Sequence, residues 1–378
     1  MPESKNLRPT RAEIDLDALA HNLRTMKAVV GSGVKIMAVV KADAYGHGAA
    51  ECSARLEQEG VDWFGVAIPE EGVELRNAGI TRPILCLGSF WPGQEQLIVK
   101  NHLVPVVFTP RVARSLNEYV NSIGRTIDIH VKIDTGMGRV GVRHDEVTAF
   151  VELLRSLPAL KVSGLMTHFA SAEDPAQNEF TALQIERFET AVSAFRSAGY
   201  SPEWIDLANS PGAIAHPESS GNLVRLGGAI FGLLDDIMPE GSKSPHLKAV
   251  LSLRSRIANI KTVPAGETLG YGRTFTTSRE SRIALVPVGY ADGYPRALSG
   301  AGHACVRGKN VPLVGRISMD WTFLDLTDIE DAAVDDEVTL IGSDGNCSIT
   351  AADLARKLDT IGYEITCGIG PRVRRVFI

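Results

Sequence analysis

The sequence predicts an α/β protein with an N-terminal TIM-type (β/α)8 barrel and a C-terminal, mostly antiparallel β domain. Apolar strand-like runs alternate with helix-like segments over about 200 residues, a polar segment follows, and the remaining chain is rich in short β runs. Alternation of this kind produces a parallel sheet, and eight repeats close it into a barrel. An open doubly wound sheet is the alternative. It fits the spacing less well, and no GxGxxG motif follows the first strand.

The barrel is expected to occupy residues 11–240. A run of alternating polar and apolar residues, Arg11–Leu16, precedes it and is a candidate to pair with the β domain, and Asp17 is expected to cap a helix that ends at Val30. Barrel strands are expected at Val34–Val40, Trp63–Ala67, Ile84–Leu87, Pro105–Phe108, Ile127–Ile133, Val162–His168, Trp204–Ala208 and Leu223–Leu226. Helices are expected between them at Ala49–Glu59, Pro69–Ala78, Gly93–Lys100, Pro110–Ile123, Asp145–Ser156, Gln177–Ala198 and Pro211–His216.

The β domain is expected to comprise residues 241–378 together with 1–10. A polar linker, Asp235–Pro245, rich in Pro, Gly and Ser, leads into it. One clear helix is expected, at Thr350–Leu358. Strands are expected at Ala249–Thr262, Ser281–Pro287, His303–Val306, Val311–Ile317, Trp321–Leu326 and Glu337–Ile341.

Composition excludes several classes of protein. The net charge is −6 with interspersed signs and no basic patch, which gives no support for nucleic-acid binding. No apolar run reaches the length of a membrane span, and the first residues lack the apolar core of a signal peptide. The 5 cysteines are scattered and form no CxxC pair, which argues against a disulfide framework and a structural zinc site. The cysteine pattern, together with the lack of a membrane span and a signal peptide, predicts a cytoplasmic protein. The histidines lack metal-ligand spacing, so we expect no metal.

Reactive residues gather at the carboxyl ends of the predicted strands, where barrel enzymes carry their chemistry. Lys41 follows an apolar strand, and partial desolvation would favour the neutral amine that acts as a nucleophile or base. Ser210 and Gly227–Gly228 follow the last two strands, the usual phosphate site of this fold. Arg225 lies inside an apolar strand and must be paired. Each also has a structural interpretation: a strand-capping lysine, ordinary tight loops and a structural salt bridge.

A lysine that forms a Schiff base and a phosphate-binding loop are the minimum requirements for binding pyridoxal 5'-phosphate. Longer sequence runs then show a family resemblance. The chain resembles the alanine racemases, which combine a barrel with a β domain, from its first residues to Pro371–Arg372. The matching runs are Ala38–Gly48 (AVVKADAYGHG), Lys132–Arg139 (KIDTGMGR), Ala208–Ser210 (ANS), Leu269–Phe275 (LGYGRTF), Val288–Arg296 (VGYADGYPR) and Gly315–Asp320 (GRISMD). The resemblance implies interconversion of L-alanine and D-alanine, with D-alanine supplied for peptidoglycan.

The resemblance also implies roles for individual residues. Lys41 would hold pyridoxal phosphate and serve as one base, and Tyr271 would be the second base on the opposite face of the substrate. A phenol is a poor base at pH 7. The resemblance implies a series of contacts from His168 toward Arg225 that would activate the Tyr271 phenol. Arg225 would face the pyridine nitrogen, and as an arginine it would leave that nitrogen unprotonated.

Further residues match supporting positions of the family. Arg139 and Met319 would contact the substrate carboxylate or the cofactor's phenolic oxygen. Lys132 matches a lysine that is carbamylated in some members, and an anion there would relieve its repulsion of Arg139. The phosphate cup would be formed by Tyr45, Ser210, Gly227, Gly228 and Tyr363, with Asn209 in the same matching run.

The resemblance further implies a homodimer with shared active sites, because the β domain of one subunit covers the barrel of the other. Residues of the partner chain would then include Tyr271, Tyr290, Arg296, Arg316 and Met319. Tyrosines at the entrance favour a small side chain such as that of alanine. Two departures, Glu173 and Ser318, affect access and specificity. A broader or serine-preferring racemase remains the nearest alternative, and a barrel decarboxylase or a non-catalytic carrier of the same cofactor is more distant.

Overall fold

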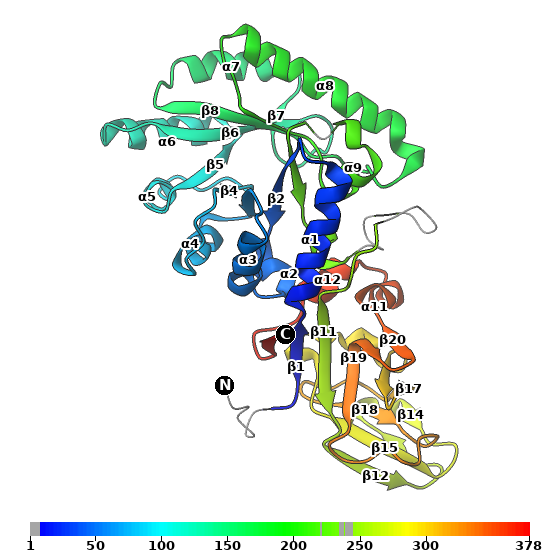
Figure 1. The fold of residues 1–378 in the computed structure, drawn as a ribbon. Coiled ribbons are helices and arrows are strands. Elements are labelled where there is room, and N and C mark those ends of the chain that lie inside the picture. The colour runs from blue at the N-terminus through cyan, green and yellow to red at the C-terminus, as the bar shows by residue number, and fades with distance from the viewer. Residues whose placement is uncertain (1–7, 220, 234–237, 239–244) are drawn as a thin grey trace. The chain divides into compact units, whose positions relative to one another are not determined.

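The computed structural model describes residues 8–219, 221–233, 238 and 245–378 (Figure 1). The described chain forms two compact units. The barrel unit contains residues 19–44 and 49–247, and the β unit contains 8–18, 45–48 and 248–378. The predicted linker, Asp235–Pro245, lies outside the described residues except for Met238 and Pro245.

The predicted parallel barrel is confirmed. Its strands are β2 (Lys35–Val39), β3 (Trp63–Val66), β4 (Ile84–Cys86), β5 (Leu103–Val107), β6 (Ile127–Asp134), β8 (Leu160–Met166), β9 (Trp204–Asp206) and β10 (Leu223–Leu226). They pair in the order β5-β4-β3-β2-β10-β9-β8-β6, and a further pairing of β5 with β6 closes the barrel. A two-residue strand that was not predicted, β7 (Val142–Arg143), lies beside β6.

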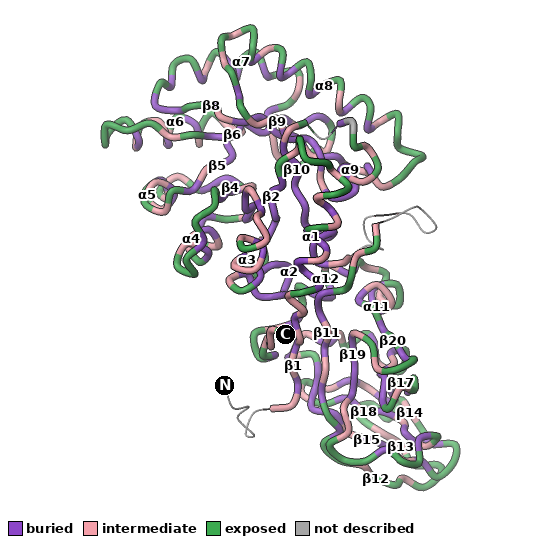
Figure 2. The backbone as a smooth tube through the Cα atoms, viewed as in Figure 1, coloured by how far each residue is buried: buried purple, intermediate pink, exposed green. Residues whose placement is uncertain are grey.

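An apolar core fills the barrel because side chains on alternate positions of each strand point inward. Its buried members are Met37, Trp63, Leu85, Val106, Met166 and Leu223. Figure 2 shows the burial along these strands. Fully burying such a side chain contributes about 1.5–3 kcal/mol, so this core gives the barrel a rigid interior.

Helices follow the barrel strands as predicted. They are α1 (Leu16–Val30), α3 (Ala49–Gln58), α4 (Pro69–Asn77), α5 (Glu95–Lys100), α6 (Pro110–Ser122), α7 (Val147–Arg155), α8 (Asn178–Ser197), α9 (Ser210–Ala215) and α10 (Gly228–Phe231). The first helix begins earlier than predicted: the Asp15 carboxylate accepts the Ala18 N–H at 2.7 Å, so Asp15 provides the capping oxygen in place of Asp17. The helix α2 (Lys41–Gly46) was not predicted.

The β unit is built on a mostly antiparallel sheet in the order β12-β15-β18-β17-β16-β19-β11-β1-β21. The strand β1 (Arg11–Ile14) pairs with β11 and β21, which confirms the prediction that this run pairs with the β domain. It lies in the β unit, although the range 11–240 given for the barrel included it. Two short helices follow β20, the predicted α11 (Ala351–Leu358) and the unpredicted α12 (Gly362–Cys367). The other strands are β11 (Leu251–Arg256), β12 (Asn259–Val263), β15 (Ser281–Val286), β16 (His303–Val306), β17 (Lys309–Val314), β18 (Thr322–Asp325), β19 (Glu337–Asp344), β20 (Cys347–Ile349) and β21 (Arg374–Phe377), with a small pair β13 (Thr268–Leu269) and β14 (Phe275–Thr276).

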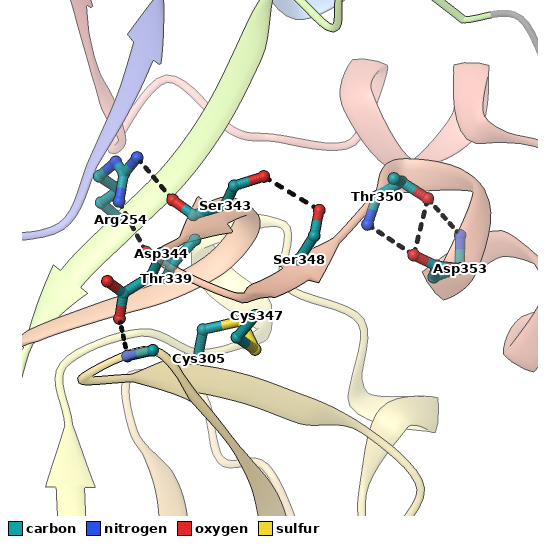
Figure 3. The surroundings of a disulfide bond; sticks show 10 residues. Arg254, Cys305, Thr339, Ser343, Asp344, Cys347, Ser348, Thr350 and Asp353 are labelled. Atoms are coloured by element: carbon teal, nitrogen blue, oxygen red, sulfur yellow. Dashed lines mark hydrogen bonds between the residues drawn. A yellow bond between two sulfur atoms is a disulfide. The ribbon is translucent and has the colours of Figure 1, made fainter.

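A disulfide joins Cys305 of β16 to Cys347 of β20 (Figure 3), so the expectation that the cysteines stay unpaired is wrong for these two. Both strands pair with β19, which brings together residues separated by 42 positions. Closing a loop of this length stabilises a fold by about 4 kcal/mol in the chain-entropy model. The bond therefore links β20 to β16 within the β unit.

Across the part of the chain that the structure describes, no helix is both long and apolar enough to cross a membrane.

Candidate active site

Lys41 lies directly after β2, at the carboxyl end of a buried strand, as predicted. The chain then makes one turn of left-handed helix: φ is 53° at Ala42, 54° at Asp43, 53° at Ala44 and 55° at Tyr45. None of these residues is glycine, and the left-handed helix costs L-residues about 1–2 kcal/mol each. Strain of this kind persists only where surrounding contacts enforce it, and it concentrates at functional sites.

Two carboxylates hold the strained turn. Glu71 of α4 accepts the N–H of Ala42 at 2.7 Å with one oxygen and the N–H of Ala67 at 2.7 Å with the other. Asp43 accepts the N–H of Ala49, the first residue of α3, at 2.8 Å. The residue next to Lys41 is therefore fixed to the loop after β3. Sequence analysis missed Glu71, because nothing in its local pattern distinguishes it from an ordinary first-turn helix carboxylate.

The end of the turn packs against α12 within the β unit. The rings of Tyr45 and Tyr363 meet edge to face with centroids 5.5 Å apart. A Cβ added to Gly46 would lie 2.2 Å from the carbonyl oxygen of Thr366, and Gly46 has φ of +83°. Only glycine fits there. The structure thus brings together two of the residues predicted to form the phosphate cup.

Arg225 is buried and paired, as its position inside an apolar strand predicted. Its Nη1 forms an ion pair with the buried carboxylate of Asp206 on the neighbouring strand β9. Its Nη2 donates to the carbonyl oxygens of Thr167 at 2.8 Å and Leu207 at 3.2 Å, and to Nδ1 of His168 at 3.1 Å. Sequence analysis missed Asp206, although a carboxylate inside the apolar run Trp204–Ala208 was a signal for a buried pair.

Burial and the contact with Arg225 together keep His168 neutral. Burial, followed by the positive charge of Arg225, lowers the pKa of His168 to about 2, so the imidazole is neutral. An arginine can only donate, so Nδ1 of His168 accepts and the proton of the neutral ring is on Nε2. His168 therefore offers one N–H donor on the side away from Arg225.

Lys132 is a buried amine within a cluster of cations. Burial first, then the charges of Arg225 and Arg139, lower the pKa of Lys132 to about 7, while Asp206 acts in the opposite direction. Lys41 belongs to the same cluster, because its charge also acts on Lys132. This lowered pKa increases the fraction of Lys132 that is a neutral amine.

The loops that carry Arg139 and His168 are fastened to each other. Thr135 and Thr167 share a hydrogen bond of 2.8 Å between their hydroxyl groups. Gln184 of α8 donates to the Thr135 hydroxyl at 3.0 Å and to the His168 carbonyl oxygen at 3.1 Å. The loops after β6 and β8 thereby keep a fixed spacing.

Ser210 and Gly227 are in contact, as the predicted phosphate cup requires. The Ser210 hydroxyl accepts the N–H of Gly227 at 3.0 Å and that of Ala229 at 3.4 Å. Asn209 caps α9, since its side chain accepts the Gly212 N–H at 3.0 Å. Asn209 thus shapes the loop after β9, and Gly228 begins α10 after β10.

The remaining predicted residues lie on the β unit. Tyr271 is 73% exposed in a tight turn, and the adjoining Gly272 packs against the guanidinium group of Arg316. The Tyr290 N–H donates to the Ser318 carbonyl oxygen at 3.1 Å, next to Met319. Among the described residues, nothing hydrogen-bonds the side chains of Tyr271, Tyr290 and Arg316 or the backbone N–H of Met319.

The described residues contain no group of three or more His, Cys, Asp or Glu side chains that could hold a metal ion.

Comparisons with known proteins agree across the whole chain. Residues 14–235 match the family model for the alanine racemase N-terminal domain, and residues 250–377 match that for the C-terminal domain. The alanine racemase of Geobacter sulfurreducens is 44% identical over 98% of this chain and 97% of that protein. A solved alanine racemase of Clostridium difficile 630 has a TM-score of 0.90 and 36% identity over 99% of this chain and 97% of that one. One from Bartonella henselae, with covalently bound pyridoxal phosphate, has a TM-score of 0.88 and 27% identity over 98% and 100%.

Proposed function

This chain belongs to the alanine racemase family and is an isomerase that acts on alanine, and we propose that it interconverts L- and D-alanine by a two-base mechanism with pyridoxal 5'-phosphate held on Lys41. The observation that supports this most directly is the cluster at the carboxyl end of the barrel. There the charges of Lys41 and Arg225 both act on Lys132 and on His168.

The residues present fit the cofactor. Arg225 uses Nη2 and one Nη1 proton on protein acceptors, and its Nε–H and second Nη1–H have no partner among the described residues. The Ser210 hydroxyl oxygen accepts the N–H groups of Gly227 and Ala229, which leaves its own proton to donate to a phosphate after β9 and β10, where barrels bind phosphate. The Bartonella henselae relative holds this cofactor covalently. We therefore assign Lys41 to attachment, Arg225 to the pyridine nitrogen, and Tyr45, Ser210, Gly227, Gly228 and Tyr363 to the phosphate.

Racemisation requires proton transfer on both faces of the substrate. Bound pyridoxal phosphate withdraws electrons from the α carbon of an attached amino acid and so acidifies its α-hydrogen. A single base would return the proton to the face from which it came. We therefore assign the Lys41 amine to one face and the Tyr271 phenol to the other, so that one takes a proton while the other delivers one.

Arg225 and His168 support these two bases. Arg225 cannot lose its proton in the physiological range, so it would donate to the ring nitrogen of the bound cofactor and leave that nitrogen unprotonated. We infer that this limits electron withdrawal and suppresses transamination. His168 has Nε2–H available as a donor, and a hydrogen bond from this group would favour the phenolate form of Tyr271.

Three further residues are assigned to the substrate carboxylate and its surroundings. Arg139 is exposed and makes no hydrogen bond within the described chain, which leaves it able to pair with a carboxylate. Met319 offers its backbone N–H. The neutral fraction of Lys132 is the form that reacts with carbon dioxide, and a carbamate there would orient Arg139.

The proposed enzyme is a homodimer in which the partner chain supplies Tyr271, Tyr290, Arg316 and Met319. Three of these are exposed, with 73% of Tyr271, 52% of Met319 and 43% of Tyr290 accessible in the single chain. Exposed, unpartnered aromatic and polar groups of this kind are typical of an interface. A two-fold arrangement would give two composite sites.

Mixing two inactive variants tests the shared site. We expect Lys41→Ala and Tyr271→Phe chains to be inactive alone and to regain about a quarter of the unmodified activity after equal, random subunit exchange. Half of the dimers would be mixed, and each mixed dimer has one site with both bases. The measurement is racemase activity after exchange that is verified by mass. Absence of recovery would place both bases in one chain.

Exchange of the α-proton with solvent deuterium tests the reaction and its substrate. We expect rapid exchange and inversion with L- and D-alanine, and a loss of about tenfold or more with serine, since a small pocket discriminates by about 1–3 kcal/mol per added group. Equal rates would favour the broader or serine-preferring racemase. Release of carbon dioxide would indicate a decarboxylase.

We assign the product D-alanine to peptidoglycan synthesis, as the family resemblance implies. The sequence predicts a cytoplasmic location. The Cys305–Cys347 disulfide argues in the other direction, because disulfides are rare in reducing compartments.

A further inference from the structure

We propose that Asp206 is a positioning residue of this site, which holds Arg225 in place and supplies the negative charge that balances it. The inference rests on the proposed role of Arg225 toward pyridoxal phosphate. Asp206 is the last residue of β9 and is 0% exposed, and its partner on β10 is 4% exposed. Neither side chain is available to solvent, so their contact is enforced by the barrel.

Strand register explains why the two side chains meet. Asp206 pairs directly with Leu223, and paired residues of a parallel sheet point to the same face. Leu223 belongs to the inward-facing core, and Arg225 lies two positions farther along the same strand. All three side chains therefore point into the barrel, and the carboxylate lies beside the guanidinium group.

The hydrogen-bond arrangement indicates that Asp206 fixes an orientation. Nη1 of Arg225 donates to Asp206. The other three hydrogen bonds of the guanidinium group are all donated by Nη2. Without Asp206 the described residues would hold the guanidinium group at one nitrogen only. Holding two nitrogens fixes the plane of the group, and with it the direction of the unused Nε–H and Nη1–H donors.

The charges around the site indicate a second effect of Asp206. The positive groups that act on Lys132 come from three parts of the barrel: Arg225 from β10, Arg139 from the loop after β6, and Lys41 from the end of β2. Asp206 is the one carboxylate among the groups that shift the pKa of Lys132. Two of the four basic groups, Arg225 and Lys132, are buried, and buried cations without an anion would be strongly unfavourable.

One oxygen of Asp206 has no protein donor. Its Oδ2 is buried without a hydrogen-bond partner among the described residues. Burial raises the pKa of Asp206 to about 6, while the charge of Arg225 acts in the opposite direction. A buried carboxylate with one unpaired oxygen and a raised pKa contributes little to the stability of the fold. Its presence is better explained by its effect on the orientation and charge of Arg225.

The first test replaces Asp206 by asparagine, which keeps the size and one acceptor oxygen but removes the charge. We expect the dissociation constant of pyridoxal phosphate from the apoprotein to rise about tenfold. The pH midpoint of the bound cofactor's absorption change should move down by about one unit, because the surroundings become more positive. A merely structural residue would move neither. Unchanged values in Asp206→Asn would overturn the inference.

A double-mutant cycle with Arg225→Gln tests whether Asp206 acts through Arg225. In the Arg225→Gln protein we expect Asp206→Asn to raise the dissociation constant of the cofactor by less than a further twofold. The reason is that the guanidinium group, which Asp206 positions, is absent. An equal, additive tenfold effect in both backgrounds would contradict the positioning role. The measurement is equilibrium titration of each apoprotein with pyridoxal phosphate.

Glu95→Gln is the matched control. Glu95 is a buried carboxylate of α5, hydrogen-bonded to Ser115 and distant in the chain from the site residues, and its replacement should leave cofactor affinity within twofold. If Asp206→Asn does not fold, Asp206→Glu is the alternative variant, because it keeps the negative charge but displaces it. An unchanged dissociation constant of pyridoxal phosphate in Asp206→Glu would then overturn the inference. Failure of the unmodified protein to bind the cofactor or racemise alanine would instead reject the proposed function.

Discussion

Replacing Lys41 by alanine is expected to abolish racemisation, with a loss of at least about 10⁴-fold, and to end covalent retention of pyridoxal phosphate. A catalytic base alone accounts for about 10²–10⁴-fold, and Lys41 is also the proposed attachment point. Its position supports the size of this effect, because the left-handed turn at Ala42–Tyr45 holds the residue after a buried strand. The measurements are the rate of inversion of each enantiomer and the mass of the protein after borohydride reduction.

Lys35 provides the control for this experiment. It lies at the other end of the same strand, where it pairs with Asp62 at 2.9 Å. We expect Lys35→Ala to keep full activity and to carry the reduced cofactor on the peptide that contains Lys41. Label on Lys35 or on Lys132 would contradict the assignment.

Replacing Tyr271 by phenylalanine is expected to slow removal of the α-proton of L-alanine by about 10³-fold, while exchange of the D-alanine proton changes far less. The asymmetry follows because each base serves one face of the substrate, and Lys41 remains for the other face. The measurement is loss of the α-deuterium from each labelled enantiomer in a single turnover.

Tyr119→Phe is the control, since Tyr119 lies on α6 and takes no part in the proposed site. We expect it to treat both enantiomers as the unmodified protein does. Equal losses for the two enantiomers in Tyr271→Phe would reject the assignment of one base to each face, even if overall activity fell. The pair of experiments thus separates a loss of the second base from a general loss of structure.

Much of the fold was predictable because its signals are local. Each barrel strand is a short apolar run between helix-like segments, and the structure places all eight close to their predicted positions. The partner of Arg225 was predictable in kind, since a buried guanidinium group requires an acceptor. Its identity was not, because Asp206 meets it through the register of two strands.

The turn after Lys41 shows where local prediction stops. Four consecutive residues without glycine favour right-handed conformations, yet the chain is left-handed from Ala42 to Tyr45. Hydrogen bonds to Glu71 and Asp43 favour this arrangement. The Glu71 contact comes from outside the turn, and the Asp43 contact joins the turn to the first residue of α3. No pattern within the turn itself therefore predicts them.

The sequence by itself determined the order of the eight barrel strands and of most helices, the residue types at the strand ends and the family. Periodicity and residue chemistry are properties of short segments, which explains this success. Tertiary structure alone decided which side chains meet: Asp206 with Arg225, Tyr45 with Tyr363, and Cys305 with Cys347 across 42 positions. These contacts depend on strand register and packing between distant segments, which are set by the free energy of the whole fold, so no local pattern identifies the two partners.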